Sequence, residues 1–317
     1  MSAQIHLRRF GVIASFLTLT LILSSFLAAC GSGTGSGNPT AAPTNTPTSN
    51  CNVGGTTFDP TQFHLVTANT LTVASDTTYP PQEFQDPQNP NNYIGSDLDI
   101  IKEIGKRICL GSTVILPTAF DSIITGLTTP QLGQQRYDLS ISAFSITPDR
   151  QQKVDMIPYF QAGESLLVAP GNPENIQSLN DLCGKKVAVE KGTVELDELN
   201  MLNATGGACA SNNVDILSFT SQDDVVLQLL NHRADATYQD SPVTGYYVSK
   251  NPGKVQQGPI TVAPSPEGIV MRKDNPNLEN AVKKALCSMV QDGTYAKILQ
   301  NWGQQSGELP MSQFVCS

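Results

Sequence analysis

The chain has 317 residues, of which 39% are hydrophobic and 15% charged, and its formal net charge is −9 at pH 7. This length suits one large domain or two lobes with buried cores. The negative balance argues against a nucleic acid partner, because phosphate binding needs clustered Lys and Arg. The three histidines, His6, His64 and His232, stand at no zinc-ligand spacing, and the seven cysteines form no CxxC motif, so we expect neither a metal site nor a cofactor.

The N-terminus has the layout of an export signal. Arg8 and Arg9 precede an uncharged, mostly apolar stretch that runs from Phe10 to Ala29. The stretch ends in Leu27-Ala28-Ala29-Cys30, which resembles the bacterial lipobox, where the cysteine is lipidated and becomes the new N-terminus. A plain transmembrane anchor is the alternative, since the apolar run is near spanning length. We predict a lipoprotein signal peptide over 1–29, lipidation at Cys30, and export to the outer face of the cell membrane.

The segment after Cys30 has no apolar face to bury. Residues 31–50 are drawn only from Gly, Ser, Thr, Asn, Pro and Ala. Such a composition predicts a disordered tether, which we extend over 30–60. No later segment reaches the roughly 18 uncharged apolar residues that a membrane helix needs.

Export changes the interpretation of the remaining cysteines. Six are left beyond Cys30, and an even number outside the cytosol favours disulfides. Six cysteines allow about fifteen pairings. Pairing neighbours in sequence gives Cys183–Cys209 and Cys287–Cys316 and leaves Cys51–Cys109. Buried free thiols are the alternative.

The first part of the globular chain alternates between strand and helix patterns. A helix capped by Ser96 or Asp97 is predicted before Gly111, with Ile100, Ile101, Ile104 and Ile108 as its apolar stripe. Strands are predicted at 71–74, 114–116 and 137–142 and a short helix at 121–127, followed by a helix with Thr147 as N-cap and Pro148 at its first position.

The alternation restarts after Gly163. Strands are predicted at 186–189, 215–217 and 234–238, helices after Gly192-Thr193 and from a capping box at 221–224 to Leu230, and C-terminal helices over 277–300. Alternating strands and helices predict an α/β fold with a largely parallel sheet in each of two modules. Ligands bind at the carboxyl ends of such strands, and Asp76, Ser142 and Ser145 follow predicted strand ends.

Searches for enzyme motifs find little. The sequence contains neither a GxSxG elbow nor a GxxxxGK[ST] phosphate loop. His232 is interpreted as a surface cap at a helix end, and Asp223-Asp224 as carboxylates that complement a helix dipole. Arg150, near the start of a helix that follows a strand end, could grip a carboxylate bidentately, although a plain surface arginine is the alternative.

Several segments together resemble one family. They are LTVASDTTYPPQEF (71–84), IGSDLDIIKEIGKRI (94–108), AFDSIITGL (119–127), YDLSISAFSITPDRQQKVDMIPYF (137–160), VAVEKGT (187–193) and ADATYQDSPVTGYYV (234–248). In this order and over about 65–305, the chain resembles the family 3 extracellular solute-binding proteins, the polar amino-acid receptors of ABC importers.

The resemblance implies a type II periplasmic-binding-protein fold, in which two α/β lobes are joined by two crossing segments. Lobe 1 would comprise 61–162 and 264–317, and lobe 2 would comprise 163–263. The ligand would bind between the lobes, which close around it. Such interfaces are where small-ligand clefts are expected.

The resemblance also implies roles for single residues. Arg150 matches the arginine that clamps the ligand α-carboxylate, assisted by the Ser145 amide and by the backbone at Thr193 and Val194. Val194 stands where many members have Thr or Ser, so a hydroxyl contact is lost. Asp240 matches the aspartate that pairs with the α-ammonium, near the Ala143 carbonyl.

Other matched positions surround the ligand side chain. Asp76 and Ser142 face it, Tyr79 and Phe120 form its walls, and Glu190 can touch it. Gln82 departs from the Phe that is common in the family at this position. Two carboxylates and two rings favour Arg, Lys or His as ligand. If Asp76 is instead a loop cap and Glu190 is exposed, Gln or another polar amino acid fits as well.

The function implied is that of a receptor rather than an enzyme. It would act as a monomer and deliver a polar, basic amino acid to a membrane permease that a separate ATPase drives. Two alternatives are a sensing module for a membrane receptor and a dehydratase-like enzyme on the same fold. The enzyme would need an acid or base in the cleft, for which only Asp76, Glu190 and Asp240 are candidates.

Overall fold

The computed structural model describes residues 50–130, 135–260, 262–314 and 316. These residues lie within a compact unit, Asn45–Ser317. The predicted signal peptide, Cys30 and the tether up to residue 49 lie outside the described residues. In the described part of the chain, no helix is both long and apolar enough to cross a bilayer.

The first sheet has five strands in the order β7-β3-β8-β15-β9. Their bounds are Thr70–Ser75 (β3), Ser112–Pro117 (β7), Leu139–Ser140 (β8), Asp155–Ala162 (β9) and Ser265–Met271 (β15). β3 runs parallel to β7 and β8, whereas β15 is antiparallel to β8 and β9. The strand predicted at 137–142 shortens to two residues, because the chain leaves the ladder before Ala143, whose φ of 47° is left-handed.

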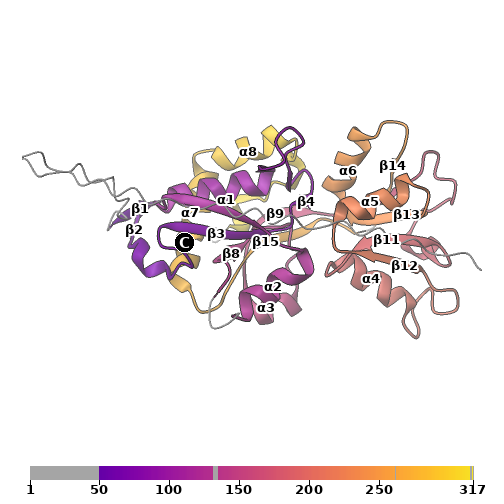
Figure 1. The fold of residues 1–317 in the computed structure, drawn as a ribbon, viewed down its shortest axis with the longest axis horizontal. Coiled ribbons are helices and arrows are strands. Elements are labelled where there is room, and N and C mark those ends of the chain that lie inside the picture. The colour runs from indigo at the N-terminus through magenta and orange to yellow at the C-terminus, as the bar shows by residue number, and fades with distance from the viewer. Residues whose placement is uncertain (1–49, 131–134, 261, 315, 317) are drawn as a thin grey trace, which may run out of the picture. The chain divides into compact units, whose positions relative to one another are not determined.

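Helices cover both faces of this sheet (Figure 1). They are α1 (Ser96–Arg107), α2 (Phe120–Thr128), α3 (Pro148–Lys153), α7 (Pro276–Gln291) and α8 (Thr294–Trp302). α1, α7 and α8 share one face and a core with the Ile100, Ile101 and Ile104 stripe, while α2 packs on the other face. The N-cap of α1 is Gly95 rather than Ser96 or Asp97, since both side chains turn into the interior.

The second sheet also has five strands, in the order β12-β11-β13-β10-β14. They are β10 (Glu164–Val168), β11 (Lys186–Glu190), β12 (Asp215–Phe219), β13 (Ala236–Asp240) and β14 (Gln256–Ile260). α4 (Val194–Asn203) covers one face, and α5 (Gln222–Leu230) and α6 (Ser241–Lys250) cover the other (Figure 1). His232 is exposed just after α5, and Asp223 lies in the first turn of α5, as predicted.

The chain passes between the two sheets twice. It leaves the first sheet at β9 and enters the second at β10 through Gly163, and it returns between β14 and β15. A Cβ atom at Gly163 would lie 2.6 Å from the Val262 carbonyl oxygen, so the two connections run side by side and require glycine there. The C-terminal helices therefore pack on the first sheet, as the resemblance implies. A small sheet of β4 (Thr78–Tyr79), β5 (Glu83–Gln85) and β6 (Tyr93–Ile94) precedes α1.

The tether predicted over 30–60 is wrong for its last ten residues. β1 (Cys51–Val53) and β2 (Thr56–Phe58) form an antiparallel hairpin, and a 3₁₀ turn, Pro60–Phe63, follows. Cys51 and Val53 are buried, and Phe58 packs near Phe63 with ring centroids 6.3 Å apart. This alternation of buried and exposed positions is that of a half-buried strand, which the polar composition before residue 50 obscures.

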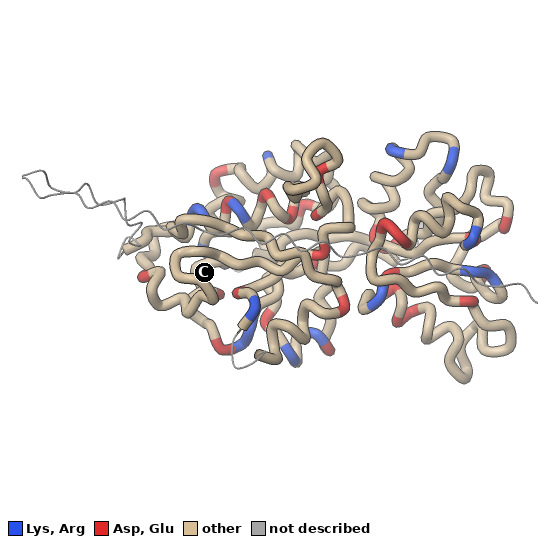
Figure 2. The backbone as a smooth tube through the Cα atoms, viewed as in Figure 1, with Lys and Arg blue, Asp and Glu red and all other residues tan. Residues whose placement is uncertain are grey.

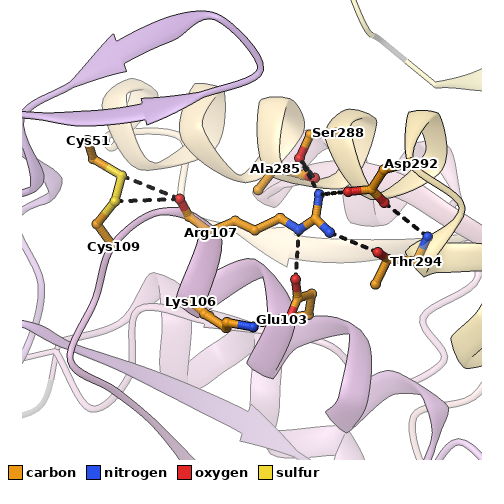
Figure 3. Close-up of polar contacts among 9 residues, drawn as sticks. All are labelled: Cys51, Glu103, Lys106, Arg107, Cys109, Ala285, Ser288, Asp292 and Thr294. Carbon is orange, nitrogen blue, oxygen red and sulfur yellow. Dashed lines mark hydrogen bonds and ion pairs between the residues drawn. A yellow bond between two sulfur atoms is a disulfide. The ribbon is translucent and has the colours of Figure 1, made fainter.

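Three disulfides are formed, with the predicted pairing: Cys51–Cys109, Cys183–Cys209 and Cys287–Cys316. The first ties the hairpin to the end of α1, next to the Arg107 carbonyl (Figure 3). The Arg107 guanidinium pairs with Glu103 within α1 and joins α1 to the C-terminal helices through Ser288, Asp292 and Thr294. The first disulfide thus fastens the hairpin covalently to the first lobe.

Candidate ligand-binding cavity

All eleven residues that the family resemblance implied line one cavity between the two sheets: Asp76, Tyr79, Phe120, Ser142, Ala143, Ser145, Arg150, Glu190, Thr193, Val194 and Asp240. Two further carboxyl residues, Glu83 and Glu195, also line it. The cavity therefore contains one guanidinium and five carboxyl groups.

Strand ends place most of these side chains. Asp76 follows β3, Ser142 and Ala143 follow β8, and Glu190 and Asp240 end β11 and β13. β3 and β8 are parallel, as are β11 and β13, so their carboxyl ends meet at one edge of each sheet. The two edges face each other across the cavity, which is the position at which α/β sheets bind ligands.

Arg150 is held at one end of the cavity. One terminal nitrogen donates to the Ser145 carbonyl at 2.8 Å, and the other donates to the Gly192 carbonyl of the second lobe at 3.1 Å. Its guanidinium carbon lies 5.5 Å from the Phe120 ring centroid and 5.2 Å from that of Phe144. These bonds use two of the five N–H donors of the guanidinium, so its fork retains donors for a carboxylate. The alternative of a plain surface arginine does not hold.

Two helix starts lie beside Arg150. Thr147 caps α3 by accepting from the Arg150 amide at 3.3 Å, as its sequence pattern predicted. Thr193 caps α4 by accepting from the Leu196 amide at 3.2 Å, and its hydroxyl donates to the Glu190 carbonyl at 2.9 Å. Val194 is consequently the first residue of α4, where backbone amides point out of the helix and favour an anion.

Tyr79 of the first lobe meets Asp240 of the second. The Tyr79 hydroxyl donates to Asp240 Oδ2 at 2.9 Å and accepts from the Asp240 amide at 3.1 Å. Burial raises the pKa of Asp240 to about 7, while the bond from Tyr79 and the charge of Arg150 act in the opposite direction. The Asp240 carboxyl therefore combines a hydrogen bond from the first lobe with a pKa near neutral.

Asp76 caps local structure as well as lining the cavity. Its Oδ1 accepts from the Thr78 amide at 3.0 Å and from the Thr78 hydroxyl at 2.6 Å, and its Oδ2 accepts from the Phe120 amide at the start of α2 at 3.0 Å. The loop-cap interpretation of Asp76 is therefore correct. Glu190, by contrast, is 2% exposed, so the interpretation that leaves it at the surface is wrong.

A hydrogen-bonded chain links Asp76 to Glu83. The Asp76 amide donates to the Ser142 hydroxyl at 2.9 Å, and that hydroxyl donates to Glu83 Oε1 at 2.8 Å. Glu83 enters the site from β5, outside both large sheets. Asp76, Glu83 and Glu190 are called the acidic end of the cavity below.

Behind the acidic end lies a buried polar layer. Asp97 Oδ2 accepts from the Ala143 amide at 3.2 Å and from the Tyr159 hydroxyl, and Gln82 Nε2 donates to Glu267 Oε2 at 2.6 Å. The left-handed backbone conformation of Ala143 is sterically unfavourable, and the hydrogen bond from its amide to Asp97 helps to hold it. Gln82, where the family commonly has Phe, thus belongs to this layer rather than to the cavity wall.

Burial dominates the electrostatics of the cavity. It raises the pKa of Asp76, and raises the pKa values of Glu83, Glu190 and Glu195 well above the usual range for a carboxyl. Burial also lowers the pKa of Arg150, which the charges of Glu195 and Asp240 oppose. A cavity with five carboxyls and one guanidinium disfavours a ligand with net negative charge.

The two lobes lie close together around the cavity. The Gln222 amide of the second lobe donates to the Thr78 hydroxyl at 3.0 Å, in addition to the bonds of Tyr79 and Arg150. A Cβ atom at Gly192 would lie 2.8 Å from the Asp121 Cα atom, so this approach requires glycine. The space free of protein atoms is about 300 Å³, but only about 10 Å³ of it admits the centre of a water molecule. A ligand must therefore displace side chains or part the lobes.

Sequence reasoning missed Glu83 and Glu195. Glu195 lies in the first turn of α4, where an acidic residue is ordinary because it complements the helix dipole. Glu83 lies in β5, a three-residue strand of the small three-stranded sheet, which is too short to show a clear sequence pattern. Their positions in the sequence could have indicated them, because Glu195 directly follows the matched residue Val194 and Glu83 lies within the first matched segment.

Comparisons with known proteins agree with this geometry. The model of the bacterial extracellular solute-binding proteins, family 3, matches residues 71–305. The histidine-binding periplasmic protein of Escherichia coli K12 is 29% identical over 242 residues, which cover 73% of this chain and 86% of that protein. The lysine/arginine/ornithine-binding periplasmic protein of Escherichia coli K12 is 30% identical over 246 residues, 74% of this chain and 87% of that protein.

A solved structure shows the same fold. An ancestral arginine-binding protein bound to arginine superposes with a TM-score of 0.67 and 33% identity, covering 74% of this chain and 98% of that one. The two-lobe α/β architecture, the cavity between the strand ends and the match over 71–305 lead to one conclusion. The chain belongs to the bacterial extracellular solute-binding proteins of family 3.

Proposed function

We propose that the protein is an extracytoplasmic receptor that binds a basic amino acid, Arg, Lys or His, in this cavity. The observation that carries the proposal is the charge pattern of the cavity, which is lined by one guanidinium, that of Arg150, and five carboxyl groups. An α-amino acid needs a cation for its carboxylate and an anion for its ammonium. A basic side chain needs a second anion, which the acidic end supplies.

The matched residues divide between the parts of such a ligand. Arg150 takes the α-carboxylate, with the backbone of Ser145, Thr193 and Val194 beside it. Asp240 and the Ala143 carbonyl take the α-ammonium. Asp76, Ser142 and Glu190 face the side chain, and the rings of Tyr79 and Phe120 flank it.

The energetics are sufficient for a receptor. Micromolar affinity corresponds to about −8 kcal/mol. Hydrogen bonds to charged groups contribute about 1.5–3 kcal/mol each, and water exclusion strengthens them. Two such clusters and two ring contacts can exceed the cost of ordering the ligand and closing the lobes.

A second ligand class is favoured by one observation. Both oxygens of Asp76 already accept hydrogen bonds from Thr78 and Phe120. Asp76 is therefore partly satisfied without a ligand, which suits a neutral polar side chain such as that of glutamine. We prefer the basic ligand, because two further carboxyl groups, those of Glu83 and Glu190, are buried near Asp76 and can accept from a cationic side chain.

The proposal includes the lobe boundaries, the lipid anchor and the transport partners expected from the sequence. Lobe 1 is assigned to 61–162 and 264–317 and lobe 2 to 163–263. The chain is a monomer that is anchored through lipidated Cys30 and delivers its ligand to an ABC permease with a separate ATPase. It releases the amino acid chemically unchanged. Loss of membrane association in a Cys30→Ala variant tests the anchor.

Thermal-shift screening of the exported domain against the common amino acids tests the proposal. Arg, Lys or His should raise the melting temperature most, because a ligand that binds only the folded state stabilises it by mass action. No shift with any amino acid would contradict the receptor role. A largest shift with glutamine would support the second ligand class instead.

A further inference from the structure

Asp76, Glu83 and Glu190 line one end of the same cavity, and all three are buried. The Glu190 carboxyl lies within hydrogen-bonding reach of Asp76, and the Glu83 carboxyl lies within reach of Asp97 on α1. Two carboxylates without a proton repel each other, so each buried pair requires a shared proton or another cation.

Two buried carboxyl oxygens at the acidic end have no hydrogen-bond donor among the residues that the structure describes. Glu83 is 0% exposed and Glu190 is 2% exposed. No N–H or O–H donor of the described residues reaches Glu83 Oε2 or Glu190 Oε1. Each of these buried oxygens needs a proton or a cation nearby, because an uncompensated buried charge is costly.

The described groups around these pairs are further carboxyls and hydroxyls, and none of them is a cation. Glu83 faces Asp76 after β3, Asp97 on α1 and Ser142 after β8, and Tyr159 of β9 and Glu267 of β15 lie behind it. Glu190 faces Asp76, Glu195 of α4 and Asp121 of α2.

The cation of the cavity is at the other end. The charges that act most strongly on the pKa of Arg150 are those of Glu195, Asp240 and Asp197, followed by Tyr79. The described carboxyl groups also form no cluster of three or more that could hold a metal ion. Protons are thus the cations available to the acidic end until a ligand arrives.

We propose that a basic amino acid binds by proton exchange: its cationic side chain replaces at least one proton shared by Asp76–Glu190 and Glu83–Asp97, and Glu83 is a further residue that selects for positive charge. This inference rests on the proposed function and deepens it. The O–H bond of a carboxyl breaks, the proton passes to solvent, and the carboxylate accepts an N–H of the ligand. Charge is conserved, since one cation enters as one leaves.

The exchange distinguishes basic from neutral ligands. A glutamine side chain carries no charge, so it leaves the shared protons in place. Both ligand types bring the same α-ammonium to Asp240, and any proton that Asp240 releases is common to both. The difference between the two ligands therefore isolates the acidic end.

Calorimetric titration with L-arginine and with L-glutamine, in buffers of different ionisation enthalpy near pH 7, measures the protons released. Arginine should release about one proton or more in excess of glutamine. The ratio of arginine to glutamine affinity should then rise by up to about tenfold per pH unit for each excess proton. These measurements use the unaltered chain and do not depend on a variant folding.

A Glu83→Gln variant tests the residue itself. It should lower the excess proton release and weaken arginine binding by about tenfold, while glutamine binding stays within about threefold. Glu174→Gln is the matched control, because Glu174 lies on the surface and pairs with Lys185, and it should change neither quantity.

Each outcome decides something. Arginine binding without excess proton release would overturn the exchange and leave the receptor role intact. Excess release that Glu83→Gln leaves unchanged would overturn the role of Glu83. Equal weakening of arginine and glutamine by Glu83→Gln would give Glu83 a structural role through Ser142 instead. Failure of every amino acid to bind would overturn the proposed function and the exchange together.

Discussion

At the arginine end of the cavity, a guanidinium faces carboxyl groups and backbone carbonyls. Arg150 lies near Asp240 and Glu195, and it also bonds the carbonyls of Ser145 and Gly192. At the acidic end, carboxyl groups lie beside carboxyl groups, and burial raises the pKa values of Glu83 and Glu190 well above the usual range. Figure 2 shows that acidic residues recur along the backbone on both sides of the gap between the sheets.

This difference explains how one cavity can bind a ligand that carries three charges. The arginine end is preformed, because the carbonyls of Ser145 and Gly192 already position its guanidinium. The acidic end is incomplete, because its charge is suppressed by protons until a better cation arrives. The first end should hold any α-amino acid, and the second should decide which side chain is preferred.

The largest expected effect follows from Arg150→Lys. Lysine keeps the charge but loses the planar fork that grips a carboxylate in two places. We expect every amino acid that binds to weaken by about 100-fold, equivalent to about 2.7 kcal/mol. Calorimetric titration with arginine, lysine and glutamine measures this. A loss confined to the basic ligands would assign Arg150 to the wrong end of the cavity.

A smaller and selective effect is expected from Glu190→Gln. The substitution keeps the size of the side chain but removes its ability to become an anion. Arginine and lysine should bind about 10- to 30-fold more weakly, since a hydrogen bond to a charged group is lost. Glutamine should bind within about threefold of the original affinity. Weakening that is equal for all three ligands would show that Glu190 does not read side-chain charge.

The stability of the protein without ligand should fall as pH rises. Burial raises the pKa of Asp97 to about 6 and that of Asp240 to about 7, from an ordinary value of 3.8. The folded state then binds protons more tightly than the unfolded state, so stability is greatest below about pH 4 with respect to these groups and is lost up to about pH 7.

Thermal melts between about pH 5 and pH 8 check this expectation. Each lost kcal/mol should lower the melting temperature by about 2–4 °C for a domain of this size. The increase that saturating arginine produces should grow over the same range. A melting temperature that rises across this window would contradict the buried, proton-holding state of these carboxyls.

The smallest effect is expected from Tyr79→Phe. The change removes the hydroxyl that bridges the lobes to Asp240 but keeps the ring beside the ligand. The ligand ammonium then has no competitor for Asp240, whereas the closed lobes lose a contact. These effects oppose each other, so affinity should change by less than about fivefold for basic and neutral ligands alike. A loss above tenfold would make the Tyr79 hydroxyl a direct ligand contact.

The sequence predicted the strand-end residues of the site well. Asp76, Ser142 and Asp240 follow or end strands with clear apolar patterns, and Arg150 follows a Thr-Pro helix start. Rules about strand ends and helix caps act locally, so they can be applied without knowing the packing. The same holds for the disulfides, for which short sequence separation favoured two pairs and left the third.

Features that depend on packing were not predicted. α6 contains Pro242 and Gly245 and two consecutive tyrosines, a poor helix pattern that tertiary contacts override. Glu83 reaches the cavity only because β5 folds against α1 and the end of β8. The proton-sharing pairs join residues 14 to 114 positions apart in sequence, and no local pattern reveals them.

Titration of the wild-type protein with L-arginine and L-citrulline tests the central claim most directly. Citrulline replaces the guanidinium by a neutral urea group of similar size and leaves the α-amino acid moiety unchanged. Because the acidic end selects for charge, arginine should bind at least about tenfold more tightly near pH 7, and the ratio should increase with pH. Equal affinities, or a ratio that does not depend on pH, would contradict the account.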